Sequence, residues 1–322
     1  MTEISIDEFR QFKDRLDKAK KILLIVHEKP DGDTLGSACA LAGYLKKREA
    51  DFKIFSISPI PADFEFLPFS DCVTGGQSAW DENLDLIVVL DSSNLKYAGV
   101  EGNISGLNPK PFIVNIDHHA SNSMFGDLNI LKTDAASTTE IIYSFFRDLH
   151  IPLDADIATC LLNGMMTDTM TFNNAATTAS VIEASARLLA HGAKFRDISR
   201  HIFFNKNLTV LKLWGKALSK LSANNPWGVA ITLVTQEDLK AAGLTENEST
   251  GLSNFLNSLD ARAVMVLTEQ SDGTLKGSLR TTRENVNVMS LAKFFGGGGH
   301  KKAAGFTIKG KIEKTADGFK II

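Results

Sequence analysis

Short apolar runs alternate with helical stretches through the first part of this 322-residue chain, and this alternation constrains the fold more than any other feature. The runs lie at residues 21–27, 52–57, 85–90 and 112–116, and their length fits strands that are buried on both faces. A capping-box pattern at Ser5 and Glu8 starts a first helix, and further helical stretches lie at residues 35–47, 138–149, 155–166 and 178–191. Strands that alternate with helices indicate βαβ units. The predicted fold class is therefore α/β, with a mainly parallel sheet flanked by helices.

A polar helical segment without strand patterns precedes a second group of elements. The segment is broken at Asn224-Asn225-Pro226, and we interpret residues 193–225 as a helical connector. Beyond it, strand patterns lie near residues 228–234, 262–269 and 275–281, and helical patterns lie near residues 246–259 and 288–294. We therefore expect a first domain at residues 1–192 and a second, smaller α/β domain at residues 226–322, across a cleft from the first.

Composition excludes several classes of protein. Hydrophobic residues make up 43% and charged residues 23% of the chain, as in a globular protein with a core. The apolar runs Ile22–Val26 and Leu86–Leu90 have five residues each, whereas a membrane-spanning helix needs about 20. The N-terminus lacks a signal-peptide pattern, and the three cysteines, Cys39, Cys72 and Cys160, lack metal-ligand spacing. We therefore expect a cytoplasmic protein with reduced thiols and no membrane partner.

The charge balance bears on the kind of ligand. Lysines and arginines number 35 and aspartates and glutamates 38, which gives a formal net charge of −3. Proteins that grip a long polyanion through many phosphates usually carry a basic surplus. The balance predicts a short or small anionic ligand and no long duplex DNA, and it leaves room for a local basic pocket.

Acidic and imidazole side chains follow the carboxyl ends of three predicted strands. They are His27, Asp31 and Asp33 after the first run, Asp91 after residues 85–90, and Asp117, His118 and His119 after residues 112–116. Ligands of open parallel sheets bind outside the carboxyl ends of the strands, so we expect these side chains to lie close together. Asp168 follows a helix and could join them from a loop.

Each of these residues alone has an ordinary structural explanation. Asp31 and Asp33 could form a turn with a helix N-cap, Asp91 could cap the next segment, and the two neighbouring histidines could lie on the surface. Five carboxylates and three imidazoles at one sheet edge are harder to explain in this way. Carboxylates with some imidazole suit Mn²⁺ or Mg²⁺. Because the ligands outnumber those of one ion, we interpret them as a two-metal site, with the ions roughly 3.5–4 Å apart.

Four segments, taken in order, resemble the motifs of the DHH phosphoesterase family. They are His27 to Asp33, Val89 to Asp91, Asp117 to His119, and Thr167 to Thr169. The later segment from Gly297 to Gly305, which includes His300, is similar to the signature of the DHH-associated C-terminal domain. The resemblance spans roughly residues 15 to 310, and five motifs in order are specific where one is weak.

The resemblance implies a role for each residue of the first domain. Two Mn²⁺ ions per chain are implied, with Mg²⁺ as the alternative. His27 and Asp31 would hold one ion, Asp33, His118 and Asp168 would hold the second, and Asp91 would bridge the two. Asp117 would fix an imidazole, as metal-bound histidines usually require, and His119 would lie near the scissile phosphate. Asp91, Asp117, His118 and His119 form the implied catalytic group.

The glycine run before His300 predicts an anion site in the second domain. One glycine is enough to cap a helix, whereas consecutive glycines such as Gly298 and Gly299 leave backbone N–H groups open to close approach. Arg280 and Arg283 supply charge, and arginine matches phosphate in a bidentate way. Arg283 could equally be a solvated surface residue. The family match at Arg280 favours substrate binding by Arg280, Gly298, Gly299 and His300.

The implied activity is hydrolysis of short oligoribonucleotides or dinucleotides and of 3′-phosphoadenosine 5′-phosphate, as in the nanoRNase branch of the family. Many members of that branch carry an arginine where this chain has Asn173, so the preferred substrate stays open. We interpret Ser137-Thr138-Thr139 as a helix cap with a candidate substrate contact. A second copy of the chain is a candidate partner.

Other activities fit the same motifs less well. An inorganic pyrophosphatase or exopolyphosphatase would carry a different C-terminal domain without the glycine signature. A RecJ-type exonuclease is disfavoured by the short, acidic chain. A non-catalytic nucleotide sensor would show the loss of a ligand, whereas all the expected motif residues are present.

Overall fold

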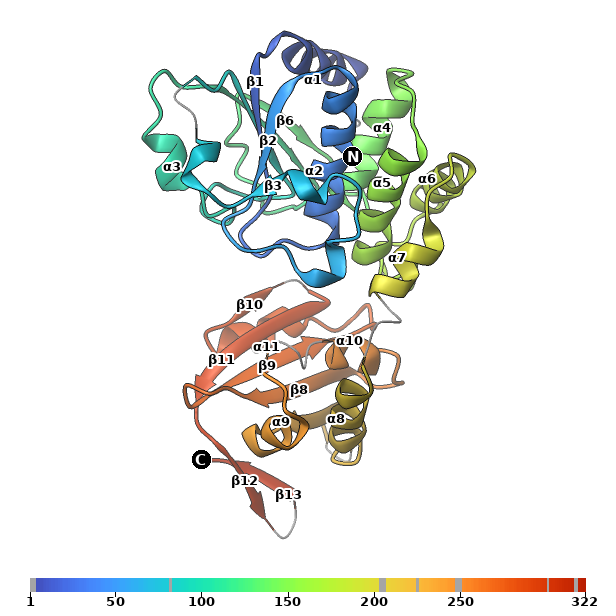
Figure 1. The fold of residues 1–322 in the computed structure, drawn as a ribbon. Helices are drawn as coiled ribbons and strands as arrows, with labels where there is room; N and C mark the ends of the chain where they lie inside the picture. The colour runs from blue at the N-terminus through green and yellow to red at the C-terminus, as the bar shows by residue number, and fades with distance from the viewer. Residues whose placement is uncertain are drawn as a thin grey trace. The chain divides into compact units, whose positions relative to one another are not determined.

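The computed structural model describes residues 4–80, 83–202, 207–223, 226–246, 251–299, 301–315 and 318–322. The chain forms two compact units, residues 1–205 and residues 206–322. Each unit is built around its own sheet (Figure 1).

The sheet of the first unit contains six parallel strands in the order β3-β2-β1-β4-β5-β6. The strands are β1 (Lys21–Ile25), β2 (Asp51–Phe55), β3 (Val73–Thr74), β4 (Leu86–Leu90), β5 (Phe112–Asp117) and β6 (Leu128–Leu131). From β1 the chain moves outward through β2 and β3, and it then returns to add β4, β5 and β6 on the other side. The order therefore reverses between β1 and β4, and such a point opens a crevice at the carboxyl ends of the strands.

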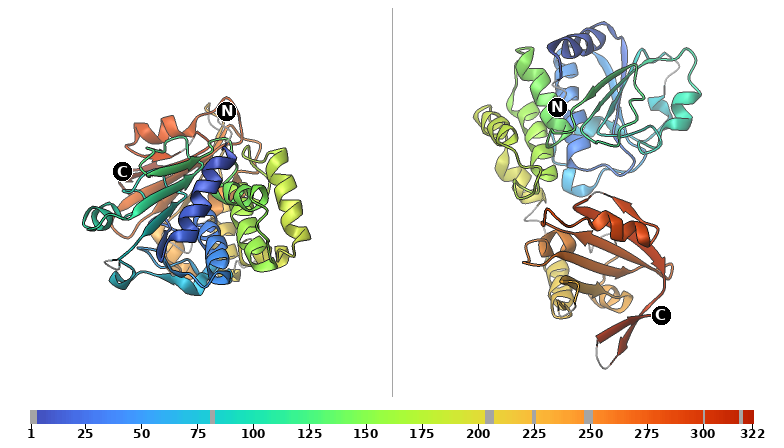
Figure 2. Two further views of the ribbon diagram at one scale, coloured as in Figure 1. Left: turned by 90° about the horizontal axis from the view of Figure 1, so that it is seen from above. Right: turned by 180° about the vertical axis from the view of Figure 1, so that it is seen from behind.

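Helices cover both faces of this sheet unequally (Figures 1 and 2). They are α1 (Ile6–Lys18), α2 (Gly32–Lys47), α3 (Glu101–Ser105), α4 (Thr138–Asp148), α5 (Ala155–Asp168), α6 (Ala179–Ala190) and α7 (Phe195–Ile202), with short 3₁₀ turns η1 (Ala62–Phe64), η2 (Ser70–Cys72) and η3 (Gln77–Ala79). Residues of α1, α2, α4 and α5 form one large core with one face of the strands. The other face packs on α3 and its flanking loops in a smaller core.

Helices α2 and α5 approach each other closely at glycine positions. A Cβ atom on Gly36 of α2 would lie 2.5 Å from the backbone oxygen of Cys160 in α5. A Cβ atom on Gly32 would lie 2.4 Å from Thr167, and one on Gly164 would lie 2.6 Å from a carboxylate oxygen of Asp33. The glycines therefore let the two helices pack more tightly than larger residues would allow.

The second unit contains a five-stranded mixed sheet in the order β10-β11-β9-β8-β7 and a separate two-stranded hairpin. Its strands are β7 (Val229–Val234), β8 (Ala263–Glu269), β9 (Thr274–Arg280), β10 (Gly298–Gly299), β11 (Ala303–Lys309), β12 (Ile312–Thr315) and β13 (Gly318–Ile321). Its helices are α8 (Leu208–Leu218), α9 (Gln236–Ala242), α10 (Leu252–Leu256) and α11 (Val288–Phe294). Only β7 and β8 run parallel in this sheet, and the other neighbouring pairs are antiparallel.

The predicted fold class is confirmed, since a parallel sheet flanked by helices is followed by a second, smaller α/β unit. The elements that were not predicted are strands β3, β6, β10, β11, β12 and β13 and helices α3 and α9. The helix expected at residues 246–259 is described only as α10. The segment interpreted as a connector contains α7, which packs on α5 in the first unit, and α8, which packs on α9 and β7 in the second. The domain bounds given above stay a prediction.

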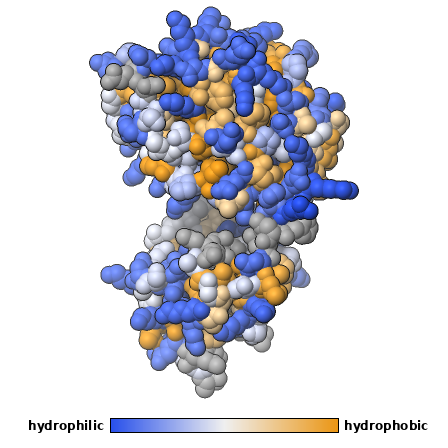
Figure 3. All heavy atoms as spheres, viewed as in Figure 1, coloured by the Kyte–Doolittle hydropathy of each residue, from blue (hydrophilic) through white to orange (hydrophobic). Residues whose placement is uncertain are grey.

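The surface is mainly hydrophilic in the view of Figure 3, with apolar side chains interspersed. Among the described residues, no helix is both long and apolar enough to span a membrane.

The close approach of α2 and α5 gives a first prediction. Because the Cβ atom of a Gly36→Ala variant would meet a backbone oxygen, a helix must shift, and we expect the free energy of unfolding to fall by about 1–3 kcal/mol. Gly102→Ala is the matched control, since nothing lies within 4 Å of a Cβ atom there. Urea unfolding followed by circular dichroism measures both. An unchanged Gly36→Ala midpoint would contradict the packing.

Candidate metal centre

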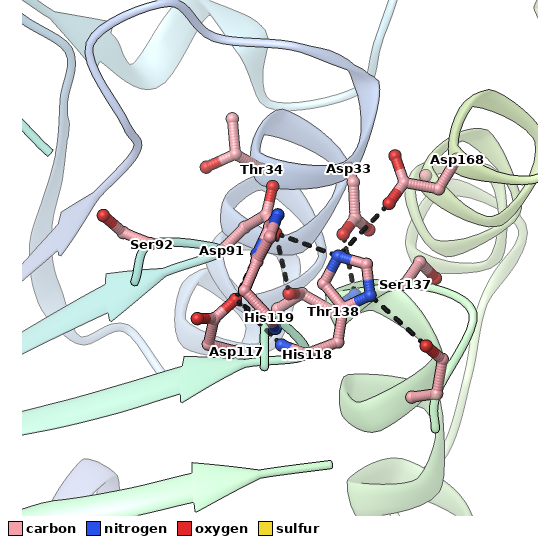
Figure 4. A network of polar contacts seen from close by, with 12 residues as sticks. Asp33, Thr34, Asp91, Ser92, Asp117, His118, His119, Ser137, Thr138 and Asp168 are labelled. Carbon is pink, nitrogen blue, oxygen red and sulfur yellow. Dashed lines mark hydrogen bonds and ion pairs between the residues drawn. The ribbon is translucent and has the colours of Figure 1, made fainter. Parts of the chain in front are cut away.

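The crevice between β1 and β4 collects the acidic and imidazole side chains that follow the strands (Figure 4). Asp91 directly follows β4, and His118 and His119 directly follow β5. Asp31 caps α2, its side chain accepting the backbone N–H groups of Asp33 and Thr34. Asp168 is the last residue of α5, so the expectation that it joins from a loop is wrong. The backbone hydrogen bonds of α5 continue to Asp168, and the N–H group of Thr169 caps the carboxyl end of the helix.

Potential ligand atoms in this crevice form groups within 4.8 Å of one another. The groups are His27, Asp31 and Asp91; Asp33, His118 and Asp168; and Asp91, His118 and His119. The first two correspond to the two ion sites that the sequence motifs imply, and Asp91 also stands 3.5 Å from the His118 imidazole of the second group. The structure thus brings all six predicted ligands together.

The first group surrounds the Nε2 atom of His27. This atom lies 3.6 Å from an Asp31 oxygen and 3.5 Å from an Asp91 oxygen. Burial lowers the pKa of His27, but the attraction of these two carboxylates outweighs it and raises the pKa to about 10. Asp91 itself has a φ of 54°, a left-handed conformation that aspartate tolerates better than most residues and that marks local strain.

The second group surrounds the Nε2 atom of His118. This buried nitrogen lies 3.4 Å from an Asp168 oxygen and has no hydrogen-bond partner among the described residues. Its other ring nitrogen, Nδ1, lies 3.3 Å from the backbone oxygen of Ala135, to which it donates. Since Nδ1 carries the hydrogen, Nε2 presents a lone pair toward the carboxylates, as a metal-binding imidazole does.

The amino end of α4 holds the buried carboxylate of Asp33. This carboxylate accepts the backbone N–H groups of Thr138 at 2.7 Å and Thr139 at 2.9 Å, and also the Thr139 hydroxyl at 2.7 Å. The Thr138 hydroxyl donates to Asp91 at 3.1 Å. The predicted cap is present, because the Ser137 side chain accepts the Glu140 N–H. The two threonines were assigned no part in holding metal ligands, although their position beside the cap signal was visible in the sequence.

The Asp117 carboxylate orients His119. Its oxygen accepts the His119 ring Nδ1–H at 2.7 Å and the backbone N–H groups of His118 and His119. Burial lowers the pKa of His119, but the hydrogen bond to Asp117 and the nearby carboxylates raise it to about 9. Asp117 therefore fixes the ring of His119, whereas the ring of His118, the implied metal ligand, is held by Ala135. The expectation that Asp117 fixes a metal-bound imidazole stays a prediction.

The donor set fits divalent cations of the Mn²⁺ or Mg²⁺ type. The candidate ligand atoms lie 3.4–3.6 Å from one another, which is longer than an ordinary hydrogen bond. Two atoms that each bind one ion at about 2.1 Å stand roughly 3 Å or more apart, so the observed spacing fits ligands of a shared ion. Burial and the charge of Asp91 raise the pKa of Asp33 to about 7, and burial and neighbouring carboxylates raise that of Asp168 well above its ordinary range. Bound cations relieve such repulsion between buried carboxylates.

In the second unit, Arg280 lies at the end of β9, opposite Ala303 of β11. Its guanidinium donates at 2.9 Å to the Asn254 side chain and to the backbone oxygen of Leu279, and no ion pair joins it to a described residue. Arg283 instead pairs with Asp260. Gly298 and Gly299 form the exposed edge strand β10 beside β11. His300 lies outside the described residues.

The parallel sheet and its carboxylate crevice define a class of metal-binding α/β protein, and comparison with known proteins defines the family. Residues 21–165 match the DHH family, N-terminal domain, and residues 228–320 match the DHHA1 domain. The chain belongs to the DHH family, as its motifs predicted. It is 30% identical over 291 residues to the bifunctional oligoribonuclease and PAP phosphatase NrnA of Thermus thermophilus, covering 90% of this chain and 84% of that protein.

Two further comparisons place the chain among related proteins. It is 27% identical over 257 residues to a probable manganese-dependent inorganic pyrophosphatase of Streptococcus thermophilus, covering 73% of this chain and 81% of that protein. The crystal structure of an exopolyphosphatase-related protein from Bacteroides fragilis superposes with a TM-score of 0.89 at 24% identity, covering 97% of this chain and 94% of that one. This last likeness shows the fold alone.

The threonine–carboxylate contacts give a second prediction. Thr139→Val keeps the side-chain shape but removes the hydroxyl that donates to Asp33, so the affinity for Mn²⁺ should fall about 10-fold. Titration calorimetry of the metal-free protein measures this affinity. Thr159→Val is the control, because that hydroxyl donates to the backbone oxygen of Ala155 and accepts the backbone N–H of Lys194 without contacting a metal ligand. Equal Mn²⁺ affinity in wild type and Thr139→Val would show that the hydroxyl does not support the site.

Proposed function

We propose that this protein is a manganese-dependent phosphoesterase that hydrolyses short oligoribonucleotides or dinucleotides and 3′-phosphoadenosine 5′-phosphate. The observation that carries the proposal is the juxtaposition of His27, Asp31 and Asp91 with Asp33, His118 and Asp168 in one crevice. The name of the Thermus thermophilus relative supports the substrate class. The pyrophosphatase relative supports manganese as the metal. The free thiols accord with the cytoplasm as the place of action.

The six ligands would hold two divalent ions, with Asp91 shared between them. When bound, such ions supply Lewis-acid activation of water and of the phosphoryl oxygens. The chain's own contribution is to position the ligands. The Ala135 oxygen sets the tautomer of His118, Thr138 and Thr139 hold Asp91 and Asp33, and Asp117 orients the His119 ring beside the crevice for a hydrogen bond to the scissile phosphate.

The second unit would bind the part of the substrate that does not react. The described partners of the Arg280 guanidinium are neutral, so its positive charge is not balanced by a described carboxylate. This charge can therefore pair with an anionic ligand. The glycines of β10 offer a surface without side chains for close approach of a phosphate. Arg283, by contrast, is neutralised by Asp260.

The metal requirement and the substrate class are tested together as a third prediction. Protein stripped with a chelator should lose turnover, which Mn²⁺ restores best and Mg²⁺ less well. The substrates are a diadenosine dinucleotide, 3′-phosphoadenosine 5′-phosphate, pyrophosphate and a long single-stranded RNA. Faster turnover of pyrophosphate than of the dinucleotide would favour the pyrophosphatase activity instead. Turnover that survives chelation would overturn the metal assignment.

The bridging role of Asp91 gives a fourth prediction. Asp91→Asn keeps the side-chain shape and tolerates the left-handed backbone, but it removes a charge shared by both ion sites. We expect turnover to fall roughly 1,000-fold or more, about 4 kcal/mol of transition-state stabilisation. Asp134→Asn, at an exposed carboxylate paired with Lys132, is the control and should stay near wild type. Retention of a tenth of wild-type turnover by Asp91→Asn would show that the assignment is mistaken.

The proposed roles of the two units, metal binding in the first and substrate binding in the second, give a fifth prediction. A charged hydrogen bond to phosphate contributes about 1.5–3 kcal/mol, so Arg280→Ala should lower kcat/KM for the dinucleotide roughly 10- to 100-fold with normal metal content. Bis-p-nitrophenyl phosphate lacks the second nucleotide and should be affected much less. Lys240→Ala, on α9, is the control. Equal losses on both substrates would place Arg280 at the reacting phosphate or in support of the fold.

A further inference from the structure

An exposed aromatic side chain, Tyr97, lies at the edge of the candidate metal centre and belongs to none of its ligand groups. The centroid of its ring is 5.3 Å from that of His27, and the two ring planes are inclined by 46°. His27 is buried, whereas Tyr97 is 50% exposed. Tyr97 therefore contacts a predicted metal ligand on one side and leaves much of its ring open to a molecule that binds at the crevice.

Hydrogen bonds fix the loop that carries Tyr97, which runs from the end of β4 to α3. The side-chain oxygen of Asn94 accepts the backbone N–H group of Tyr97 at 2.8 Å. The backbone oxygen of Tyr97 accepts the N–H group of Glu28, which lies just beyond β1, at 3.4 Å. The backbone of Tyr97 is thus tied to its own loop and to the loop that follows β1. A ring on a fixed backbone loses less conformational freedom when a ligand binds.

A second exposed apolar side chain, Ile57, borders the same loop. It lies just beyond β2 and is 49% exposed. A Cβ atom on Gly99, two residues beyond Tyr97, would lie 3.3 Å from Ile57. Strands β2, β1 and β4 are neighbours in the sheet, so Ile57 and Tyr97 stand at the same carboxyl edge as the candidate ligands. This edge therefore presents an apolar surface beside the acidic crevice.

The charges around Tyr97 indicate which part of a nucleotide fits there. Burial and the carboxylates of the crevice raise the pKa of Tyr97 to about 12, so the hydroxyl keeps its proton and faces negative charge. Negative charge at this edge disfavours a second phosphate next to the ring. A nucleobase carries no charge at neutral pH, and its flat surface stacks on aromatic side chains.

We infer that Tyr97 is a stacking platform for the nucleobase next to the scissile phosphate, and that Ile57 extends this surface. The inference rests on the proposed function, which brings a nucleotide phosphate to the ion sites. His27 belongs to one of the two ligand groups, so a base joined through one ribose to the reacting phosphate can reach the ring beside it. Stacking tolerates every base, because each base has a π-face. The platform therefore favours nucleotides over phosphates without a base and does not choose among bases.

Ligand binding to the full-length protein loaded with Mn²⁺ tests this platform without relying on turnover. Titration calorimetry compares adenosine 5′-monophosphate with ribose 5-phosphate, which lacks the base. Tyr97→Leu should weaken the binding of adenosine 5′-monophosphate roughly 10-fold and leave that of ribose 5-phosphate unchanged. Tyr97→Phe keeps the ring and should bind both ligands as the wild type does. Phe195→Leu is the matched control, since it removes a comparably exposed ring on α7, which supplies no candidate ligand.

Three results would overturn the inference. Equal affinity of the wild type for the two ligands would show that the protein does not bind the base. Unchanged affinity of Tyr97→Leu for adenosine 5′-monophosphate would show that the base lies elsewhere. An equal loss of affinity for both ligands would show that the ring supports the metal centre instead. The proposed function fails on a different measurement, namely the absence of nucleotide turnover by the wild-type protein.

Discussion

The close contact between α2 and α5 is the constraint on which the candidate metal centre depends. Asp33 stands in the first turn of α2 and Asp168 at the last residue of α5, so these two carboxylates meet only because the helix axes run close together. The contact is made at positions without side chains, where a Cβ atom on Gly32 or Gly164 would collide with the opposite helix or with Asp33 itself. The ligands from the strand ends then complete the crevice.

The same contact brings carboxylates close together, and their mutual repulsion is offset in part by hydrogen bonds from the amino end of α4. Asp33, Asp91 and Asp168 repel one another in a region from which water is largely excluded, where charge interactions are stronger than in bulk water. The amino end of α4 directs two backbone N–H groups and two threonine hydroxyls at two of these carboxylates. A helix amino end also carries partial positive charge. The remaining repulsion raises the pKa values of Asp33 and Asp168, and divalent ions relieve it best.

The sequence predicts the strand-borne part of this arrangement well. Ligands that lie just beyond the carboxyl ends of β1, β4 and β5 meet at one sheet edge whatever the details of packing, because parallel strands end together. Thr138 and Thr139 were harder to assign, because an ordinary helix cap has the same pattern, and only the tertiary contact of α4 with α2 shows which carboxylates they hold. Strand β11 was missed because Ala303, Ala304 and Gly305 have low strand propensity. Its pairing with β9, rather than its own sequence, makes it a strand.

The two units carry net charges of opposite sign, which the net charge of the whole chain does not show. Residues 206–322 contain 16 lysines and arginines and 10 aspartates and glutamates, a net charge of +6 within a chain of −3. The first unit carries the acidic excess, and its buried carboxylates attract cations. The second unit carries the basic excess, which attracts the phosphates of a nucleotide. In the proposed activity, this separation would draw the divalent cations to the first unit and the anionic substrate to the second, while the near-neutral total limits adhesion to long nucleic acids.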